Sequence, residues 1–298
     1  MYLEHFGLRQ YPFALTPDTE FFLEHDEFKD ALDVLTCALT SGEGLTKIIG
    51  EIGIGKTLLC RKLLRSLDER FLIAHVPDPS ASAVPLPLAL AEQLGVVDRR
   101  DIERGPLLEM LNDRLVGLHA EGRQVVLLVD EAQALSEDDI GSLRLLSNLE
   151  TEKSKLVQIV LFGQPDLDDR LQCVHLRQLR QRVLFSHRLE PLSAEALDVY
   201  VRHRLHVAGY RGTSPFGPRA ITLLRRGSGG VPRLINVLAH KALLTAFGRG
   251  ETAVRALHVR RAVADTGEAC TGRLPSMVGG SFSGQFRSMS ARLRSIRA

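Results

Sequence analysis

The residues that suggest chemistry most directly form the stretch GEIGIGKT at 50–57, which has the spacing G-x-x-x-x-G-K-[ST]. The β-branched residues Ile48 and Ile49 precede it, and a helical pattern of leucines follows it. Glycines let such a loop turn tightly, so that successive backbone N–H groups face one anion and the next helix adds the positive end of its dipole. We therefore predict a phosphate-binding loop rather than a structural turn. The predicted nucleotide contacts of this loop are Gly50, Glu51, Ile52, Gly53, Ile54, Gly55, Lys56, Thr57 and Leu58.

A second motif, VVLLVDEAQ at 125–133, ends a strand-like apolar run with two carboxylates. At the carboxyl edge of a parallel sheet, Asp130 is placed to hold Mg²⁺ together with the hydroxyl of Thr57, and Glu131 is placed to accept a proton from the attacking water. Lys56 would neutralise the β- and γ-phosphates. Alone, such a carboxylate pair is also typical of a helix cap. With the loop upstream it predicts an ATP site with Mg²⁺, and it favours hydrolysis over nucleotide storage or a kinase reaction.

Polar residues further along fall where an ATPase needs contacts to the γ-phosphate. Gln164 follows the apolar run LVQIVLFG and is either a sensor of the γ-phosphate or a turn residue before Pro165. Arg180 and Arg182 lie in LRQLRQRV and form either an arginine finger for a neighbouring subunit or a solvated helix end. Arg233 starts a helical pattern in GGVPRLIN and is either a sensor in a second domain or a surface arginine. The residues alone leave these alternatives open.

The apolar runs predict the elements that must position these residues. Strand patterns at 71–76, 124–129 and 155–162 alternate with helical patterns, which favours a parallel sheet with helices on both faces. After residue 192 the strand patterns stop, and four helical patterns follow. We therefore predict an α/β P-loop sheet followed by a small all-α lid. The predicted segments are an N-terminal arm at 1–24, the ATPase core at 25–192, the lid at 193–268 and a basic, disordered tail at 269–298.

Composition narrows the class of protein. The formal net charge of +2 over 298 residues gives no overall attraction to nucleic acid, which makes a nucleic-acid partner unexpected. The four cysteines are scattered without a C-x-x-C pair, which predicts reduced thiols and no metal site built on cysteine. The N-terminus lacks a signal-peptide pattern, and no apolar run is long enough to span a bilayer. We therefore expect a cytoplasmic protein.

The tail contains arginines without acidic residues, and its apolar positions Phe286, Met289, Leu293 and Ile296 fall on one side if it forms a helix. This spacing predicts either peripheral contact with the inner membrane or a partner, or a disordered end with incidental spacing.

Taken in order, these pieces resemble AAA+ ATPases of the general secretion pathway A (ExeA-like) type. The chain is especially similar to the shorter, MshM-type members assigned to mannose-sensitive haemagglutinin (MSHA) pilus biogenesis. The segments that carry the resemblance are FGL..YPFALTPD, GEIGIGKT, LLVDEAQALS, LRLLSNLET, LVQIVLFGQPDL, LRQLRQRV, LEPLS and GGVPRLINVLAHKALL, which extend from residue 1 to about 265.

The resemblance implies roles for individual residues. It implies that Gln164 is a sensor, that Arg233 is the sensor of the second domain, and that Arg182 is the arginine finger with Arg180 in reserve. It also implies that the arm around Pro12 and Phe13 lies against the adenine. The alternative for the arm is aromatic packing onto the first helix.

The resemblance further implies an ATP-hydrolysing assembly factor for a type IV (MSHA-like) pilus or a related secretion apparatus. Such a protein would act as an ATP-dependent homo-oligomer with machinery proteins at the inner membrane. Two alternatives are a DNA-associated AAA+ ATPase like the transposition helper proteins, and a scaffold that binds ATP but barely hydrolyses it. The membrane span and peptidoglycan-binding domain of longer members have no counterpart here. The prolines of VPDPSASAVPLPLALAEQLG predict a helix that begins late, near Leu88.

Overall fold

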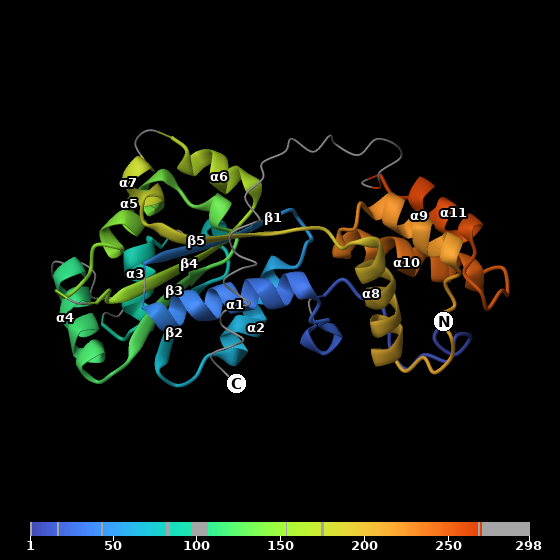
Figure 1. Ribbon diagram of the computed structural model, residues 1–298, viewed down its shortest axis with the longest axis horizontal. Coiled ribbons are helices and arrows are strands. Elements are labelled where there is room, and N and C mark those ends of the chain that lie inside the picture. The colour runs from blue at the N-terminus through green and yellow to red at the C-terminus, as the bar shows by residue number, and fades with distance from the viewer. Residues whose placement is uncertain are drawn as a thin grey trace. The chain divides into compact units, whose positions relative to one another are not determined.

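The computed structural model describes residues 2–16, 18–42, 44–81, 84–96, 107–152, 154–173, 176–267 and 269. Their contacts divide the chain into two units (Figure 1). The α/β unit comprises Val34–Ile52 and Lys56–Leu189, and the helical unit comprises Met1–Asp33, Gly53–Gly55 and Glu190–Ala298. Apart from Ala269, the predicted tail lies outside the described residues.

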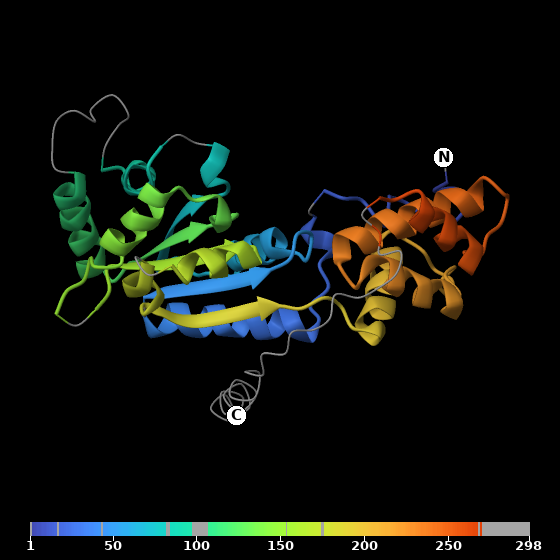
Figure 2. The same cartoon turned by 90° about the horizontal axis from the view of Figure 1, so that it is seen from above.

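The α/β unit is built on a five-stranded parallel sheet with the strand order β2-β3-β4-β1-β5. Side chains of β3 and β4 are almost all buried, as expected for central strands covered on both faces. Burial alternates along β5, the edge strand beside β1 (Figure 2). The strands are β1 (Leu45–Gly50), β2 (Phe71–Val76), β3 (Gln124–Val129), β4 (Val157–Gly163) and β5 (Val183–Leu189).

Helices cover both faces of this sheet, with α2 on one face and α6 and α7 on the other (Figure 1). The fold class predicted from the sequence, a parallel P-loop sheet followed by helices, is therefore confirmed. The helices of this unit are α2 (Lys56–Ser66), α3 (Leu86–Gln93), α4 (Leu107–Ala120), α5 (Glu137–Leu146), α6 (Pro165–Leu171) and α7 (Arg177–Arg180), with short 3₁₀ turns η2 (Pro79–Ala81) and η4 (Ala132–Ala134). Helix α1 (Asp26–Ser41) begins in the helical unit and ends in the α/β unit.

The start of α3 differs from the prediction. The helix begins at Leu86, two residues before the predicted Leu88, with Pro85 as its N-cap and Pro87 in its first turn. Proline is tolerated there because the N–H groups of a first helical turn have no partner within the helix. The prolines therefore start this helix rather than delay it.

The helical unit contains α8 (Ala194–Val207), α9 (Pro218–Ser228), α10 (Pro232–Phe247) and α11 (Ala256–Ala264), at the four predicted helical patterns. Helix α10 supplies much of the core, and α9 and α11 pack on it and on each other. Buried N-terminal aromatic residues join the same core.

One buried arginine fastens the N-terminal segment to this unit. Arg204 of α8 is 6% exposed and donates from Nε to the Pro12 carbonyl at 2.5 Å and from Nη2 to the Ala14 carbonyl at 3.3 Å. Its guanidinium lies 4.7 Å from the centre of the Phe21 ring. The predicted packing of the arm onto the first helix holds for Phe22, whose ring meets Phe28 of α1.

Phe13 packs differently, because its ring lies edge to face against Phe216, with 5.9 Å between the ring centres. It is only 2% exposed in this core. The adenine contact predicted for Pro12 and Phe13 stays a prediction.

Candidate nucleotide site

The glycine-rich loop occupies the turn between the end of β1 at Gly50 and the start of α2 at Lys56. Two of its glycines have positive φ, 77° at Gly53 and 115° at Gly55, a region that side chains disfavour. The predicted contacts Glu51 and Ile52 have exposed side chains, whereas Ile54 is 2% exposed. Any phosphate contact of Ile54 must therefore come from its backbone.

The Lys56 side chain is held inside this loop. It is 5% exposed, and Nζ donates to the Gly50 carbonyl at 2.8 Å and the Glu51 carbonyl at 3.1 Å. Burial lowers the pKa of Lys56, while the carboxylates of Glu131, Asp130 and Glu51 act in the opposite direction. A buried ammonium whose acceptors are two neutral carbonyls is suited to an added anion.

Asp130 lies at the end of β3 and is 3% exposed. Burial raises the pKa of Asp130, opposed by hydrogen bonds from the Thr57 side chain and from the backbone N–H of Glu131, whose nitrogen lies 2.9 Å from Oδ1. The structure thus joins the two predicted metal ligands, Thr57 and Asp130, directly. Hydroxyl and carboxylate oxygens are the ligands that Mg²⁺ prefers, and Mg²⁺ usually takes few protein ligands beside phosphates. These residues fit Mg²⁺.

Glu131 has a strained backbone and a defined hydrogen-bond environment. Its φ of 50° and ψ of 39° make it the one non-glycine residue with positive φ among the described residues. Such strain costs roughly 1–3 kcal/mol and tends to occur at functional sites. The carboxylate accepts hydrogen bonds from Nε2 of Gln133 at 2.5 Å and Nε2 of Gln164 at 3.3 Å. The predicted sensor and the predicted base are therefore in contact.

Gln133 is a site residue that the sequence analysis missed. While its Nε2 donates to Glu131, its Oε1 accepts from the backbone N–H of Gln164 at 3.0 Å. The side chain therefore connects the turn after β3 to the end of β4. The sequence feature that could have identified Gln133 is its position, two residues after the predicted base in the motif DEAQ.

Arg170 holds the same turn from the last turn of α6. Its Nη1 donates to the carbonyls of Gln133 at 2.8 Å and Leu135 at 2.7 Å, and its Nη2 pairs with Glu137 at 2.8 Å. Since Gln164 is the N-cap residue of α6, this helix is attached to the turn at both of its ends. Nothing in the local sequence pattern indicated this role.

Comparison with known proteins identifies the type of chain that carries this arrangement. Residues 39–171 match the family model described as an AAA domain. Over 251 residues the chain is 40% identical to general secretion pathway protein A of Aeromonas hydrophila. The aligned region covers 84% of this chain and 46% of that protein. The chain contains an AAA domain and is related to general secretion pathway protein A. It spans about half the length of that relative, at 46%.

Solved structures share the AAA+ fold at lower identity. The Aeropyrum pernix ORC1 protein in complex with DNA matches with a TM-score of 0.61 at 20% identity, covering 86% of this chain and 69% of that one. The A. pernix ORC2 protein in its ADPNP–ADP complexes matches with a TM-score of 0.57 at 19% identity, over 84% and 72%. The Thermotoga maritima RuvB branch migration motor matches with a TM-score of 0.55 at 15% identity, over 86% and 73%.

In the α/β unit, the side chains of Arg180 and Arg182 make no hydrogen bond or ion pair with Asp130 or Glu131 among the described residues. Arg182 is half-buried and donates to Ser147, to the carbonyl at 2.8 Å and to Oγ at 3.1 Å. Arg180 is exposed and makes no hydrogen bond or ion pair with the described residues. In the helical unit, the Arg233 N–H donates to the Gly53 carbonyl at 3.1 Å.

Proposed function

We propose that the chain binds and hydrolyses ATP and acts as a nucleotide-dependent oligomer in assembling a type IV (MSHA-like) pilus or a related secretion apparatus. The observation that carries the ATPase part is the joining of five predicted residues in one unit. Buried Lys56 faces the phosphates, paired Thr57 and Asp130 fit the metal, and the hydrogen-bonded Glu131 and Gln164 are suited to hold the attacking water.

The chemistry follows from the position of each side chain. Lys56 binds the β- and γ-phosphates in place of its loop carbonyls. Thr57 and Asp130 would hold Mg²⁺, which when bound neutralises phosphate charge. Glu131 takes a proton from a water whose oxygen forms a bond to the γ-phosphorus as the bond to the β–γ bridging oxygen breaks, giving ADP and phosphate. Gln164, already bonded to Glu131, orients that water or the γ-phosphate.

We place an arginine finger in the segment that contains Arg180 and Arg182, because the charge that builds on the γ-phosphate needs a guanidinium. Arg182 was the preferred finger by family resemblance, but its guanidinium is engaged by Ser147. Arg180 has an exposed guanidinium, so we propose Arg180 as the finger. Arg233 is proposed as the sensor of the helical unit.

The part played in secretion rests on the relative, which is named a general secretion pathway protein. Cytoplasmic action beside an inner-membrane apparatus is part of the proposal. No helix among the described residues is long and apolar enough to cross a membrane.

ATP binding and hydrolysis are tested by separating the two steps. Lys56→Ala should lose ATP binding, measured with a fluorescent ATP analogue. Glu131→Gln should bind normally but hydrolyse at least about a hundredfold more slowly. A parental hydrolysis rate in Glu131→Gln protein would remove Glu131 as the base.

The finger is tested by mixing variants. Arg180→Ala protein should bind ATP and hydrolyse it poorly, and adding Glu131→Gln protein should restore part of the activity, because some interfaces then combine an intact Glu131 with an intact Arg180. Arg182→Ala protein is measured in parallel. Purification from the native host in ATP would identify the apparatus by the proteins that co-purify.

A further inference from the structure

The charge of this chain is concentrated in one part of the helical unit. Residues 211–267 contain ten lysines and arginines and only two acidic residues, a formal charge of +8, whereas the whole chain has +2. The ten cations are Arg211, Arg219, Arg225, Arg226, Arg233, Lys241, Arg249, Arg255, Arg260 and Arg261. The near-neutral total therefore hides a strongly basic segment.

The two acidic residues do not neutralise the exposed cations. Glu251 pairs with Arg249 at 3.0 Å and with Arg255 at 3.5 Å, and Asp265 pairs with Lys241 at 2.8 Å. The remaining positive charge therefore faces solvent. The exposed arginines whose side chains make no hydrogen bond or ion pair with any described residue include Arg219, Arg226, Arg260 and Arg261.

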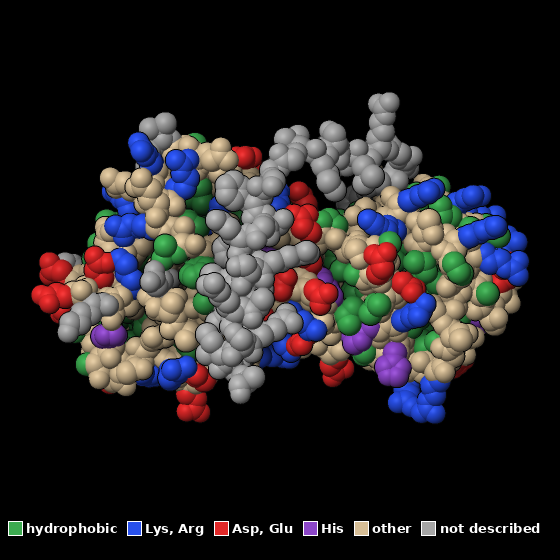
Figure 3. Space-filling view, viewed as in Figure 1, with side chains coloured by type: hydrophobic (Ala, Val, Ile, Leu, Met, Phe, Trp, Pro, Cys, Tyr) green, Lys and Arg blue, Asp and Glu red, His purple; other side chains and the backbone are tan. Residues whose placement is uncertain are grey.

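These arginines lie on two helices, α9 and α11, that pack against each other. Gly227, in the last turn of α9, lies against α11 so closely that a Cβ there would be 2.7 Å from Cγ2 of Val263. In sequence, Arg226 is next to Gly227 on α9, and Arg260 precedes Val263 on α11 by about one turn. We call the exposed arginines Arg219, Arg226, Arg260 and Arg261 the basic face. Lys and Arg side chains gather over this part of the helical unit in Figure 3.

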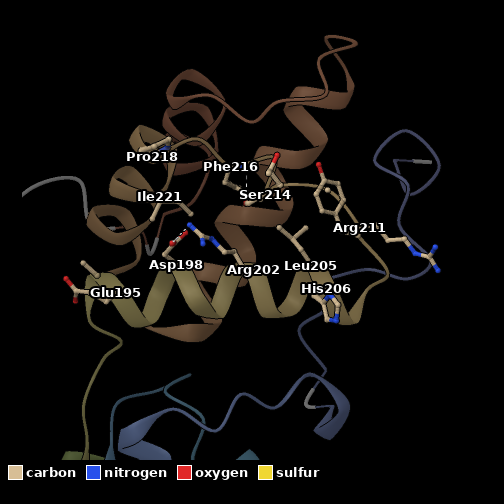
Figure 4. Close-up of a pocket in the computed structure, with 14 residues that line it drawn as sticks. Glu195, Asp198, Arg202, Leu205, His206, Arg211, Ser214, Phe216, Pro218 and Ile221 are labelled. Atoms are coloured by element: carbon tan, nitrogen blue, oxygen red, sulfur yellow. Dashed lines mark hydrogen bonds and ion pairs between the residues drawn. The ribbon is translucent and has the colours of Figure 1, made fainter.

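Two observations near the basic face argue against an apolar peptide and a single nucleic-acid strand as the ligand. No large hydrophobic side chain of α9 or α11 is strongly exposed among the described residues, so an apolar peptide has little to bind. A nearby groove of about 880 Å³ between α8 and the 210–221 segment is charge-balanced rather than cationic (Figure 4). Arg202 in that groove pairs with Asp198 at 2.6 Å. It therefore offers no positively charged channel for a nucleic-acid strand.

We propose that the basic face docks the protein on the anionic phospholipid headgroups of a bilayer surface. Unpaired guanidiniums on two adjoining helices suit an array of phosphates, and the lack of exposed apolar side chains predicts electrostatic, salt-reversible contact without insertion. This inference rests on the proposed function, which places the protein beside an inner-membrane apparatus. It does not depend on ATP hydrolysis, so binding is measured without nucleotide and again with Lys56→Ala protein.

The test is co-sedimentation of the full chain with vesicles of phosphatidylcholine alone or with phosphatidylglycerol added. We expect binding only to the anionic vesicles and its loss at high salt. Each arginine near such a surface contributes about fivefold to partitioning, so Arg226→Glu/Arg260→Glu should bind at least about 25-fold more weakly. Arg226→Lys/Arg260→Lys should bind like the parent because charge, not the fork geometry, carries the contact.

A matched control reverses two cations of the α/β unit, Arg123→Glu/Arg144→Glu, and should leave vesicle binding unchanged. Equal weakening by both charge-reversed variants would overturn the assignment to the basic face. So would full binding by Arg226→Glu/Arg260→Glu, or loss of binding when only the tail arginines are replaced by glutamine. Tighter binding to duplex DNA than to anionic vesicles at the same ionic strength would assign the face to nucleic acid instead. If the parent protein hydrolyses ATP but does not bind anionic vesicles, this inference fails and the ATPase proposal stands. If it binds the vesicles but does not hydrolyse ATP, the ATPase proposal fails and this inference stands.

Discussion

Replacing Gln133 by methionine would test whether the turn after β3 holds Glu131 ready for catalysis. Methionine keeps the length of the side chain but removes both hydrogen bonds, the one given to Glu131 at 2.5 Å and the one accepted from the Gln164 backbone at 3.0 Å. The phosphate loop, Lys56 and Asp130 keep all of their own contacts. The substitution should therefore affect turnover rather than nucleotide binding.

The size of the effect follows from the strain at Glu131. Its left-handed backbone, with φ of 50°, costs roughly 1–3 kcal/mol, which the surrounding contacts must offset. A hydrogen bond to a charged group contributes about 1.5–3 kcal/mol. Loss of the Gln133 bond leaves only the longer Gln164 contact, at 3.3 Å. We expect the productive conformation, and with it kcat, to fall about tenfold to a hundredfold.

Steady-state hydrolysis and equilibrium binding of an ATP analogue separate these outcomes. ATP affinity should change less than about threefold, because no residue that would contact the phosphates is altered. Gln178→Met is the matched control, since Gln178 is an exposed glutamine bonded only to Arg144 among the described residues. A Gln133→Met protein with the parental kcat would refute the positioning role, as would an equal loss of kcat in the control.

Three further perturbations probe other contacts. Burial raises the pKa of Asp130, so the folded protein binds the carboxyl proton more tightly than the unfolded chain does. The contribution of Asp130 to the folding free energy is therefore lost as the pH rises above its pKa in the unfolded chain, about 3.9. Asp130→Asn should raise the melting temperature at neutral pH while weakening Mg²⁺-dependent ATP binding. Gly53→Ala should destabilise by more than about 1 kcal/mol in denaturant unfolding, because its Cβ would lie 2.6 Å from that of Arg233, whereas Gly122→Ala, with a similar φ of 75° and open space, should cost only the backbone strain. Arg204→Met should free the N-terminal segment to proteolysis by leaving two carbonyls without their donor, and Arg202→Met, on the exposed side of the same helix, should not.

Local patterns were enough to predict the elements and the phosphate loop. The strands are continuous apolar runs, and the loop residues are consecutive in sequence, so each feature can be recognised within about ten residues. Asp130 and Glu131 could be assigned because a strand that ends in carboxylates places them at the sheet edge. The order β2-β3-β4-β1-β5 could not be predicted, because runs of similar composition do not specify their neighbours.

Residues whose roles depend on distant backbone groups were missed. Gln133 acts through the N–H of Gln164, 31 residues later, and Arg170 through the carbonyl of Gln133, 37 residues earlier. Arg204 reaches back 192 residues to the Pro12 carbonyl. Every residue carries a backbone C=O group, and every residue except proline an N–H group, so only the fold shows which side chains hydrogen-bond to them.

These distant contacts bear on how the site would respond to nucleotide. Helix α6 has Gln164 at its N-cap, Arg170 in its last turn and Asp168 between them, and Asp168 pairs with Lys47 of β1. The helix is thus attached to the turn after β3 at both ends and to β1, the strand that leads into the phosphate loop. A γ-phosphate that draws Gln164 away from Glu131 would break one bond of this set and leave those of Gln133 and Arg170 in place. Glu131 would then keep its strained backbone and its hydrogen bond from Gln133, so that its carboxylate stays oriented toward the water whose proton it takes.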